Sequence, residues 1–150
     1  MADIKTAEER SKNMAAIKSK NTSPELFIRK ELFRRGYRYR LYEKSVPGHP
    51  DLFLRKYNTA IFVHGCFWHR HPGCKYAYMP KSNLDFWNRK FDANIRRDKV
   101  VKDALAEDGI RCLVIWECKI KDSEKHEEKA QQLFDSIEQF LDGDLDYLEI

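Results

Sequence analysis

Residues 111–116 form the segment that most narrows the possible fold. After Arg111, the run Cys-Leu-Val-Ile-Trp is apolar at every position, so it has no polar face to turn toward solvent. Such a strand is typical of the interior of a sheet that is covered on both sides. The run is also far shorter than the ~20 apolar residues of a membrane-spanning helix. The sequence therefore predicts an α/β protein whose sheet is flanked by helices.

The elements before this strand are marked by capping and turn signals. Residues 22–25, Thr-Ser-Pro-Glu, are typical of a helix start, with a hydroxyl cap, a proline in the first turn and an acid near the positive end of the helix dipole. Gly36 is expected to end this helix. Alternating or continuous apolar patterns then predict strands over residues 37–42, 52–55 and 59–63.

An irregular loop and two more helices complete the predicted order. Residues 64–80 are dense in His, Cys, Gly and Pro and show no period. Ser82 is expected to cap the next helix, which Gly109 ends, and the last helix is expected to begin at about Ser123. The order helix, three strands, loop, helix, strand, helix predicts a mixed sheet with helices packed against it.

The length of 150 residues and the 13% aromatic content fit one domain with its own core. We expect residues 1–21, which are mostly polar, to form an N-terminal arm and residues 22–150 to form the domain. The first residues contain no apolar run of the kind found in secretory signals. This start predicts a cytoplasmic protein without membrane contact.

The charge of the chain is divided unevenly. Residues 1–122 carry 26 Lys and Arg against 15 Asp and Glu, whereas residues 123–150 carry 2 against 9. A body with a net charge of +11 suits a polyanion such as nucleic acid, although ordinary uneven surface charge gives the same numbers. The acidic C-terminal segment has no explanation at this level.

Four cysteines in a chain predicted to be cytoplasmic favour metal ligands or free thiols over disulfides. Cys66, His71 and Cys74 follow the spacing Cys-x4-His-x2-Cys, and Cys118 comes just after the apolar strand. Three thiolates and one imidazole are typical of a closed structural zinc site. The alternative is a set of buried thiols beside solvated histidines. Cys112, inside the strand, is expected to be a small core residue.

Asp51 and a set of histidines form the candidate catalytic group. An acid at a strand end, beside a backbone carbonyl of the neighbouring strand, can hold Mg²⁺ against a phosphate, but Pro-Asp is also a routine turn. His49, His64 and His69 lie with Asp51 inside 21 residues. A histidine can act as a general base toward water. The alternatives are spare loop histidines and extra zinc ligands.

Phe67, Trp68 and Trp87 are large aromatic residues that lie in or near the irregular loop. Burial is the usual fate of such side chains, but on a basic protein they could insert between base pairs and unstack them. Met14 in the arm is either a docking contact or a second wedge. Unstacking costs least where base pairing is already defective, so such a wedge favours mismatched DNA.

These stretches resemble the very short patch repair (Vsr) family, DNA mismatch endonucleases that accompany bacterial cytosine-5 methyltransferases. The motifs cover residues 10–118, and the run His-Gly-Cys-Phe-Trp-His is highly specific. The matching stretches are RSKNM at 10–14, PGHPD at 47–51, FVHGCFWH at 62–69, His71, Cys74, Phe86-Trp87, Asn94, Arg97-Asp98 and VIWEC at 114–118.

The resemblance implies a restriction-endonuclease-like fold and Mg²⁺-dependent nicking of one DNA strand on the 5′ side of the thymine in a T·G mismatch. Such mismatches arise when 5-methylcytosine deaminates. It also implies a monomer that acts at the nucleoid on double-stranded DNA, with mismatch-repair proteins as further candidate partners.

The resemblance also implies roles for individual residues. Asp51 and the Val63 backbone carbonyl would bind magnesium, with Glu25 as a supporting acid. His69 would be the general base and His64 a helper on the phosphate side. The zinc ligands implied are Cys66, His71, Cys74 and Cys118. The DNA contacts implied are Phe67, Trp68, Trp87, Met14, Lys12, Asn13, Asn94 and Arg97.

Two departures from the family pattern stand near this site. Val63 replaces a Thr of the best-known form, which leaves a backbone ligand but no hydroxyl. Residues 70–74 replace a histidine-rich run and are one residue longer. The alternative function is a non-catalytic, zinc-stabilised protein that binds mismatched or distorted DNA, and a third hypothesis is a zinc protein without a DNA partner.

Overall fold

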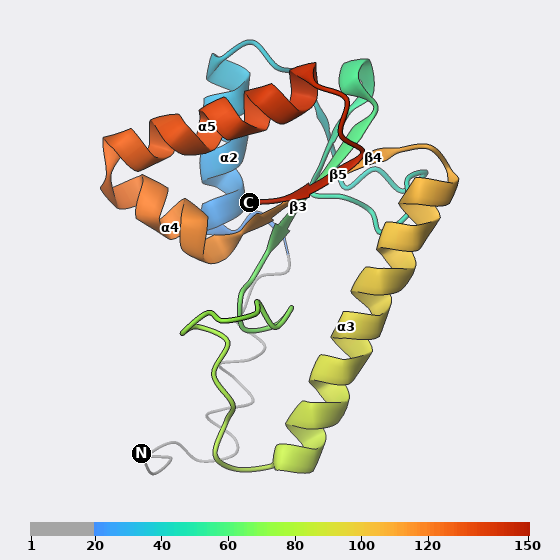
Figure 1. Ribbon diagram of the computed structural model, residues 1–150, viewed down its shortest axis with the longest axis vertical. Helices are drawn as coiled ribbons and strands as arrows, with labels where there is room; N and C mark the ends of the chain where they lie inside the picture. Colours follow the sequence, from blue (N-terminus) through green and yellow to red (C-terminus); the bar gives the residue numbers. More distant parts are fainter. Residues whose placement is uncertain (1–19) are drawn as a thin grey trace.

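The computed structural model describes residues 20–150, which are built around a five-stranded sheet in the order β1-β2-β3-β4-β5 (Figure 1). The first three strands pair antiparallel, and β3, β4 and β5 pair parallel. The mixed sheet is confirmed, with β4 inside it. The strands are β1 (Arg40–Leu41), β2 (Leu52–Leu54), β3 (Thr59–His64), β4 (Arg111–Trp116) and β5 (Tyr147–Glu149).

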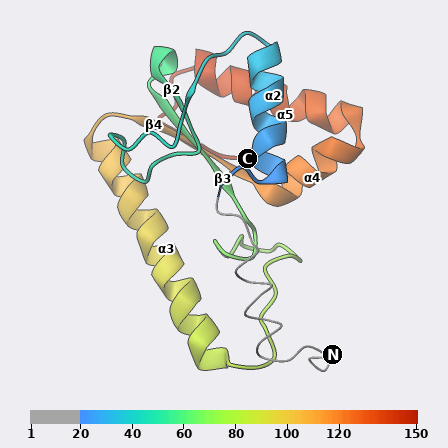
Figure 2. The same cartoon turned by 180° about the vertical axis from the view of Figure 1, so that it is seen from behind.

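Helices cover both faces of the sheet (Figures 1 and 2). The side chains of β4 alternate between them: Leu113 and Ile115 join the core beneath α2, α4 and α5, whereas Cys112 and Val114 join the core beneath α3. This two-sided burial is the reason that the strand is apolar throughout. The helices are α2 (Ser23–Arg34), α3 (Leu84–Glu107), α4 (Glu117–Lys125) and α5 (Glu127–Asp142).

The predicted helix start at residues 22–25 is confirmed in detail. Thr22 is the N-cap, and its hydroxyl accepts a 3.4 Å hydrogen bond from the backbone N–H of Glu25. The backbone N–H of Thr22 in turn donates to Oε2 of Glu25 at 3.3 Å. This reciprocal capping box satisfies two backbone donors and fixes Glu25 in the first turn.

The strand predicted over residues 37–42 is much shorter in the structure. Only Arg40 and Leu41 pair, opposite Phe53 and Leu52, because β2 offers just three residues as partners. Tyr42 then ends the strand with a positive φ of 51°.

The helix α3 packs on the sheet mainly through its C-terminal half, where Leu105 is buried. Its N-terminal half extends beyond the sheet (Figures 1 and 2). The prediction that Ser82 caps this helix is wrong. The N-cap is Asn83, which enters the helix with a φ of 57° and makes no side-chain capping bond, a conformation that Asn tolerates better than most residues.

The single last helix predicted from Ser123 is wrong as well. Two helices replace it, because the chain takes an extended conformation at His126 between α4 and α5. The acidic segment then ends in β5, which pairs with β4. Arg111 fixes the connection by donating to the carbonyls of Leu141 (3.1 Å) and Leu145 (3.0 Å). The acidic tail is therefore part of the domain. Within residues 20–150, no helix is long and apolar enough to cross a membrane.

Candidate active site

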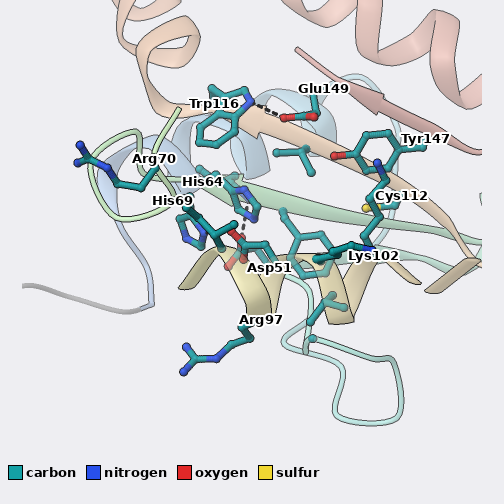
Figure 3. Close-up of a pocket in the computed structure, with 18 of the residues that line it drawn as sticks. Asp51, His64, His69, Arg70, Arg97, Lys102, Cys112, Trp116, Tyr147 and Glu149 are labelled. Atoms are coloured by element: carbon teal, nitrogen blue, oxygen red, sulfur yellow. Dashed lines mark hydrogen bonds and ion pairs between the residues drawn. The ribbon is translucent and has the colours of Figure 1, made fainter. Parts of the chain in front are cut away.

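A cleft of about 730 Å³ lies between α3 and the sheet face formed by β3, β4 and β5. Figure 3 shows Asp51, His64 and His69 gathered at one end, with Lys102 and Tyr147 toward the other. The aromatic and apolar side chains of the strands form the inner wall, and charged side chains of α3 form the outer one. The cleft therefore combines an apolar inner wall with converging polar groups, as in many enzyme sites.

Asp51 is positioned by the turn at residues 46–50, which packs against α3. Gly48 has a φ of 80°, and a Cβ atom there would lie 2.5 Å from Cγ1 of Val101, so only glycine fits. Asp51 follows this turn, and its Oδ2 accepts a 2.7 Å hydrogen bond from the backbone N–H of Val63 on β3. The acid and the strand residue predicted to act with it are thus in direct contact.

Glu25 reaches the same place from α2, with only 2% of its surface exposed. The pKa of Asp51 is raised to about 7, chiefly because the carboxyl is buried and further because the charge and side chain of Glu25 lie beside it. The hydrogen bond from Val63 acts in the opposite direction. Two carboxyl groups so close together favour a bound cation, because it would relieve both burial and repulsion.

His69 and Asp98 form the second polar pair of the cleft. Nδ1 of His69 lies 2.7 Å from Oδ2 of Asp98, which comes from α3. The imidazole of His64 stacks on that of His69 with ring centroids 3.9 Å apart and planes 4° from parallel. Burial, and to a smaller extent the neighbouring His69, lower the pKa of His64 to about 3. His64 is therefore neutral at physiological pH.

His64, His69 and Asp98 lie close enough together to be considered as metal ligands. Their geometry favours hydrogen bonding instead. The lone pairs of an imidazole lie in the ring plane, so those of two parallel stacked rings do not converge on one ion. Asp98 also already binds Nδ1 of His69. A histidine paired with a carboxylate in this way has the chemistry needed for general-base catalysis.

The four predicted zinc ligands come together in the structure. The ligand atoms of Cys66, His71, Cys74 and Cys118 all lie within 4.8 Å of one another. Sγ of Cys118 is 3.5 Å from Nδ1 of His71, and two such ligands of a tetrahedral zinc ion would be about 3.6 Å apart. His71 is held by stacking on Trp116, with centroids 4.2 Å apart. The group fits one closed metal site.

Comparison with known proteins identifies the family. The model of the family described as DNA mismatch endonuclease Vsr matches residues 2–75. A DNA mismatch endonuclease Vsr of Escherichia coli is 36% identical over 144 residues, which are 96% of this chain and 90% of the relative. The chain belongs to the Vsr family.

Two further relatives of this Vsr-family chain are similar to it over almost their whole length. A type II nicking enzyme of Neisseria meningitidis serogroup A is 42% identical over 91% of this chain and 97% of its own. A type II nicking enzyme of Xanthomonas oryzae pv. oryzae is 42% identical over 90% of this chain and 98% of its own length. The resemblance and the restriction-endonuclease-like fold are confirmed, and the chain is a DNA-cleaving hydrolase of mismatch repair.

The aromatic residues predicted to touch DNA form a cluster in this Vsr-family chain. Phe67 packs edge-on against Trp68 and Trp87, with centroids 5.1 and 5.5 Å apart, and against the buried Phe91 at 5.2 Å. The cluster lies where the loop that carries Cys66, His71 and Cys74 meets the N-terminal half of α3. Phe67 is its centre, whereas Phe86 next to Trp87 is 52% exposed. Packing within the cluster thus holds the aromatic side chains that are predicted to insert between base pairs.

The remaining predicted residues occupy different places. Asn94 donates a 3.0 Å hydrogen bond to the Trp68 carbonyl, so it holds the loop. His49 and Arg97 line the cleft, and the Arg97 side chain points away from Asp51 in Figure 3. The arm residues Lys12, Asn13 and Met14 lie outside the described part of the chain.

Sequence reasoning missed functional partners of the site. Asp98 stood in a matched motif, but no spacing rule links it to His69, which lies 29 residues away in sequence. Tyr42 and Arg29 contact Glu25, and Trp116 orients both His71 and His64. The contacts of Asp98, Tyr42 and Trp116 join different elements of the fold, so a local pattern could not have revealed them. Arg29 differs, because it lies one helical turn from Glu25 within α2, a spacing at which helix side chains meet.

Proposed function

We propose that the chain is a Mg²⁺-dependent endonuclease that nicks one DNA strand on the 5′ side of the thymine in a T·G mismatch. The observation that carries this proposal is the pair formed by Asp51 and Val63, set in one cleft with the His69–Asp98 pair. A module that only binds DNA has no use for a buried acid next to an oriented histidine.

The oxygen donors at Asp51 suit magnesium. The Asp51 carboxylate and the Val63 carbonyl would hold the ion, with Glu25 as supporting acid, because hard oxygen ligands are those that Mg²⁺ prefers. When bound, the ion would stabilise the negative charge that develops at the phosphorus during hydrolysis. Val63 serves as well as Thr for this purpose, since only its backbone is required.

His69 would accept the proton of the attacking water. A carboxylate can only accept a hydrogen bond, so Nδ1 of His69 carries the proton that faces Asp98, and Nε2 is left with a lone pair. Nε2 can then accept a proton from water, and Asp98 stabilises the imidazolium that forms. His64, neutral and stacked on His69, keeps the ring in place and faces the phosphate side.

The aromatic cluster supplies the preference for mismatched DNA. Phe67, Trp68 and Trp87 would insert beside a weakly paired T·G step, where unstacking costs least. A Zn²⁺ ion in the Cys66, His71, Cys74 and Cys118 site would keep the loop that carries them rigid. Arm residues Lys12, Asn13 and Met14 would contact the opposite groove, and Asn94 and Arg97 would support the major-groove side.

Nicking of one strand needs only one active site, so we also propose that the chain acts as a monomer on double-stranded DNA. Mismatch-repair proteins are its candidate partners at the bacterial nucleoid. Size-exclusion chromatography of the complex with a short duplex should give the mass of one chain and one duplex. A complex containing two chains would contradict this part of the proposal.

The experiment that tests the function uses matched duplexes with T·G, T·A and C·G at one position, each in several flanking sequences. With Mg²⁺, only the T·G duplex should be cut, in the thymine strand and 5′ of the thymine. Binding without any cleavage would support the alternative of a non-catalytic protein for distorted DNA. Equal cleavage of all duplexes would overturn the mismatch specificity.

A further inference from the structure

Tyr42 has a backbone conformation that is unusual for its residue type. Its φ of 51° lies in the left-handed region, which bulky side chains rarely adopt and which persists only where surrounding contacts enforce it. The residue directly follows β1, and its side chain is half-buried toward α2. Such outliers gather at functional sites, so the contacts of this side chain are informative.

The Tyr42 hydroxyl is the centre of a hydrogen-bond network around Glu25. It lies 2.8 Å from both carboxylate oxygens of Glu25. Nη2 of Arg29 donates to it at 2.5 Å, and the backbone N–H of Asn21 donates at 2.9 Å. Neither of these two donors can accept a hydrogen bond, so they use both lone pairs of the hydroxyl oxygen. The only hydroxyl proton is therefore directed at Glu25.

Glu25 is fixed by this network from two sides. Arg29 pairs with its Oε2 at 3.2 Å, and Arg29 is itself held by Oδ1 of Asn21, which accepts at 2.8 Å. Tyr42 alone lies at equal distance from both carboxylate oxygens, so it limits rotation of the carboxyl group as well as its position. The opposite side of Glu25 faces Asp51. An acid with 2% exposure thus has one defined orientation.

We propose that Tyr42 is a positioning residue of the nuclease, whose hydroxyl holds the Glu25 carboxylate beside Asp51 so that the two acids form one site for a divalent cation. The expected effect of Tyr42 on nicking rests on the proposed function. Its expected effect on metal affinity does not. Residues that orient metal-binding acids in this way commonly change affinity or activity about 10- to 100-fold when altered.

The test compares Tyr42→Phe with Tyr39→Phe. Tyr39 is a half-buried tyrosine three residues earlier, and its hydroxyl donates a 3.0 Å hydrogen bond to the carbonyl of Arg29 without contact to Glu25. Both variants lose one hydroxyl that bonds to the same helix. For each we would measure Mn²⁺ affinity by electron paramagnetic resonance, the melting temperature, and kcat and KM for nicking of a T·G duplex with Mg²⁺.

Tyr42→Phe should weaken Mn²⁺ binding and lower kcat about 10-fold or more, with KM for DNA nearly unchanged. Tyr39→Phe should leave kcat, KM and Mn²⁺ affinity near those of the unaltered protein. Equal losses in the two variants would show that Tyr42 is merely structural and would overturn the proposal. Unchanged Mn²⁺ affinity and kcat in Tyr42→Phe would overturn it too.

A second comparison asks whether Tyr42 acts through Glu25. In a protein that already carries Glu25→Gln, adding Tyr42→Phe should cause no further loss of Mn²⁺ affinity, whereas additive losses would overturn the route through Glu25. If the unaltered protein nicked no duplex at all, the proposed function would fail. Weaker Mn²⁺ binding in Tyr42→Phe alone would still support the positioning role, so the two failures are distinguishable.

Discussion

The backbone N–H of Val63 donates a 2.7 Å hydrogen bond to Oδ2 of Asp51. This contact joins the turn at residues 46–50 to the middle of the sheet and distinguishes Asp51 from an acid in a routine surface turn. The same bond orients the carboxyl group, and it opposes the rise in the pKa of Asp51 that burial and Glu25 cause. Asp51 is thus held where a cation, rather than a proton, could balance its charge.

Asp51→Asn tests this acid directly. The amide oxygen can still accept the bond from Val63, so the fold should remain, but an amide is a poor magnesium ligand. We expect kcat for nicking to fall about 1,000-fold or more. The melting temperature should stay the same or rise, because a buried charge beside Glu25 is removed. A nicking assay and a thermal melt give both results.

Binding of a T·G duplex and zinc content should hardly change in Asp51→Asn, because neither depends on this carboxyl. These two measurements serve as controls for folding. Nicking at an undiminished rate would show that the catalytic acid lies elsewhere.

Much of the fold could be predicted from local patterns. The apolar run of β4 predicted a strand covered on both sides, and the capping box at Thr22 and Glu25 predicted the start of α2, because each depends on residues close together in sequence. The candidate metal ligands could be grouped because three of them lie within nine residues and thiolates are a restrictive ligand type.

The remaining features depend on contacts between distant segments. The strand β5 is three residues long and lies among acids, so it has no period to detect, and it forms only because β4 offers a free edge. Asp98 meets His69 because α3 passes over the sheet. Tyr42 meets Glu25 because its own backbone takes the left-handed conformation directly after β1. Such pairings follow from the tertiary structure and could not be read from spacing.

Asp98→Asn should impair the general base while leaving DNA binding intact. The 2.7 Å contact between Asp98 and His69 fixes which ring nitrogen carries the proton, because a carboxylate can only accept a hydrogen bond. The amide of the variant can also donate, so it can pair with the tautomer that has no proton on Nδ1. We expect the single-turnover nicking rate to fall about 100-fold or more, by analogy with other acids that orient a catalytic histidine. Rapid-quench kinetics with saturating protein measure this step.

Asp103→Asn is the matched control for that experiment. Asp103 lies on the same helix and also lines the cleft, but it pairs with Lys99 at the surface (3.1 Å). Its loss should alter the nicking rate by less than about twofold, since exposed ion pairs contribute little. Similar losses in both variants would indicate a general effect of charge in α3.

Glu31 gives a prediction for acid stability away from the active site. Hydrogen bonds from Arg34 and Arg35 lower its pKa to about 2, against a smaller opposing effect of burial. The folded protein therefore binds this proton less readily than the unfolded chain, whose value is 4.5. The stabilisation is complete above about pH 4.5 and is lost as the pH falls toward 2.

Glu31→Gln should reduce the free energy of unfolding by about 1 kcal/mol at pH 7, because the pairs are partly exposed. The difference from the unaltered protein should shrink as the pH falls below 4.5 and approach zero only below about pH 2. Urea melts across this range measure it. Any metal held at the cysteine site would be lost from both proteins in acid as the thiolates protonate, so the difference between the two proteins is the readout. A constant difference at all pH values would refute the assignment.

Removal of the zinc proposed for the cysteine site should be visible in thiol chemistry. Cys66, Cys74 and Cys118 would be ligands, whereas Cys112 is a core residue with 5% exposure, and burial raises its pKa to about 12. With about one zinc per chain bound, iodoacetamide should label none of the four readily. After chelation, mass spectrometry should find label on Cys74 and Cys118 first, and Cys112 should stay unlabelled.

The same chelation should loosen the loop at residues 64–80 from the sheet. Cys118 lies in the first turn of α4, directly after β4, so it would be the ligand that ties the loop to the interior of the domain. We expect the melting temperature to fall and nicking to be lost together, because Phe67, Trp68 and His69 all lie in this loop. A metal-free preparation that keeps its full melting temperature and nicking rate would show that the cysteines are ordinary thiols.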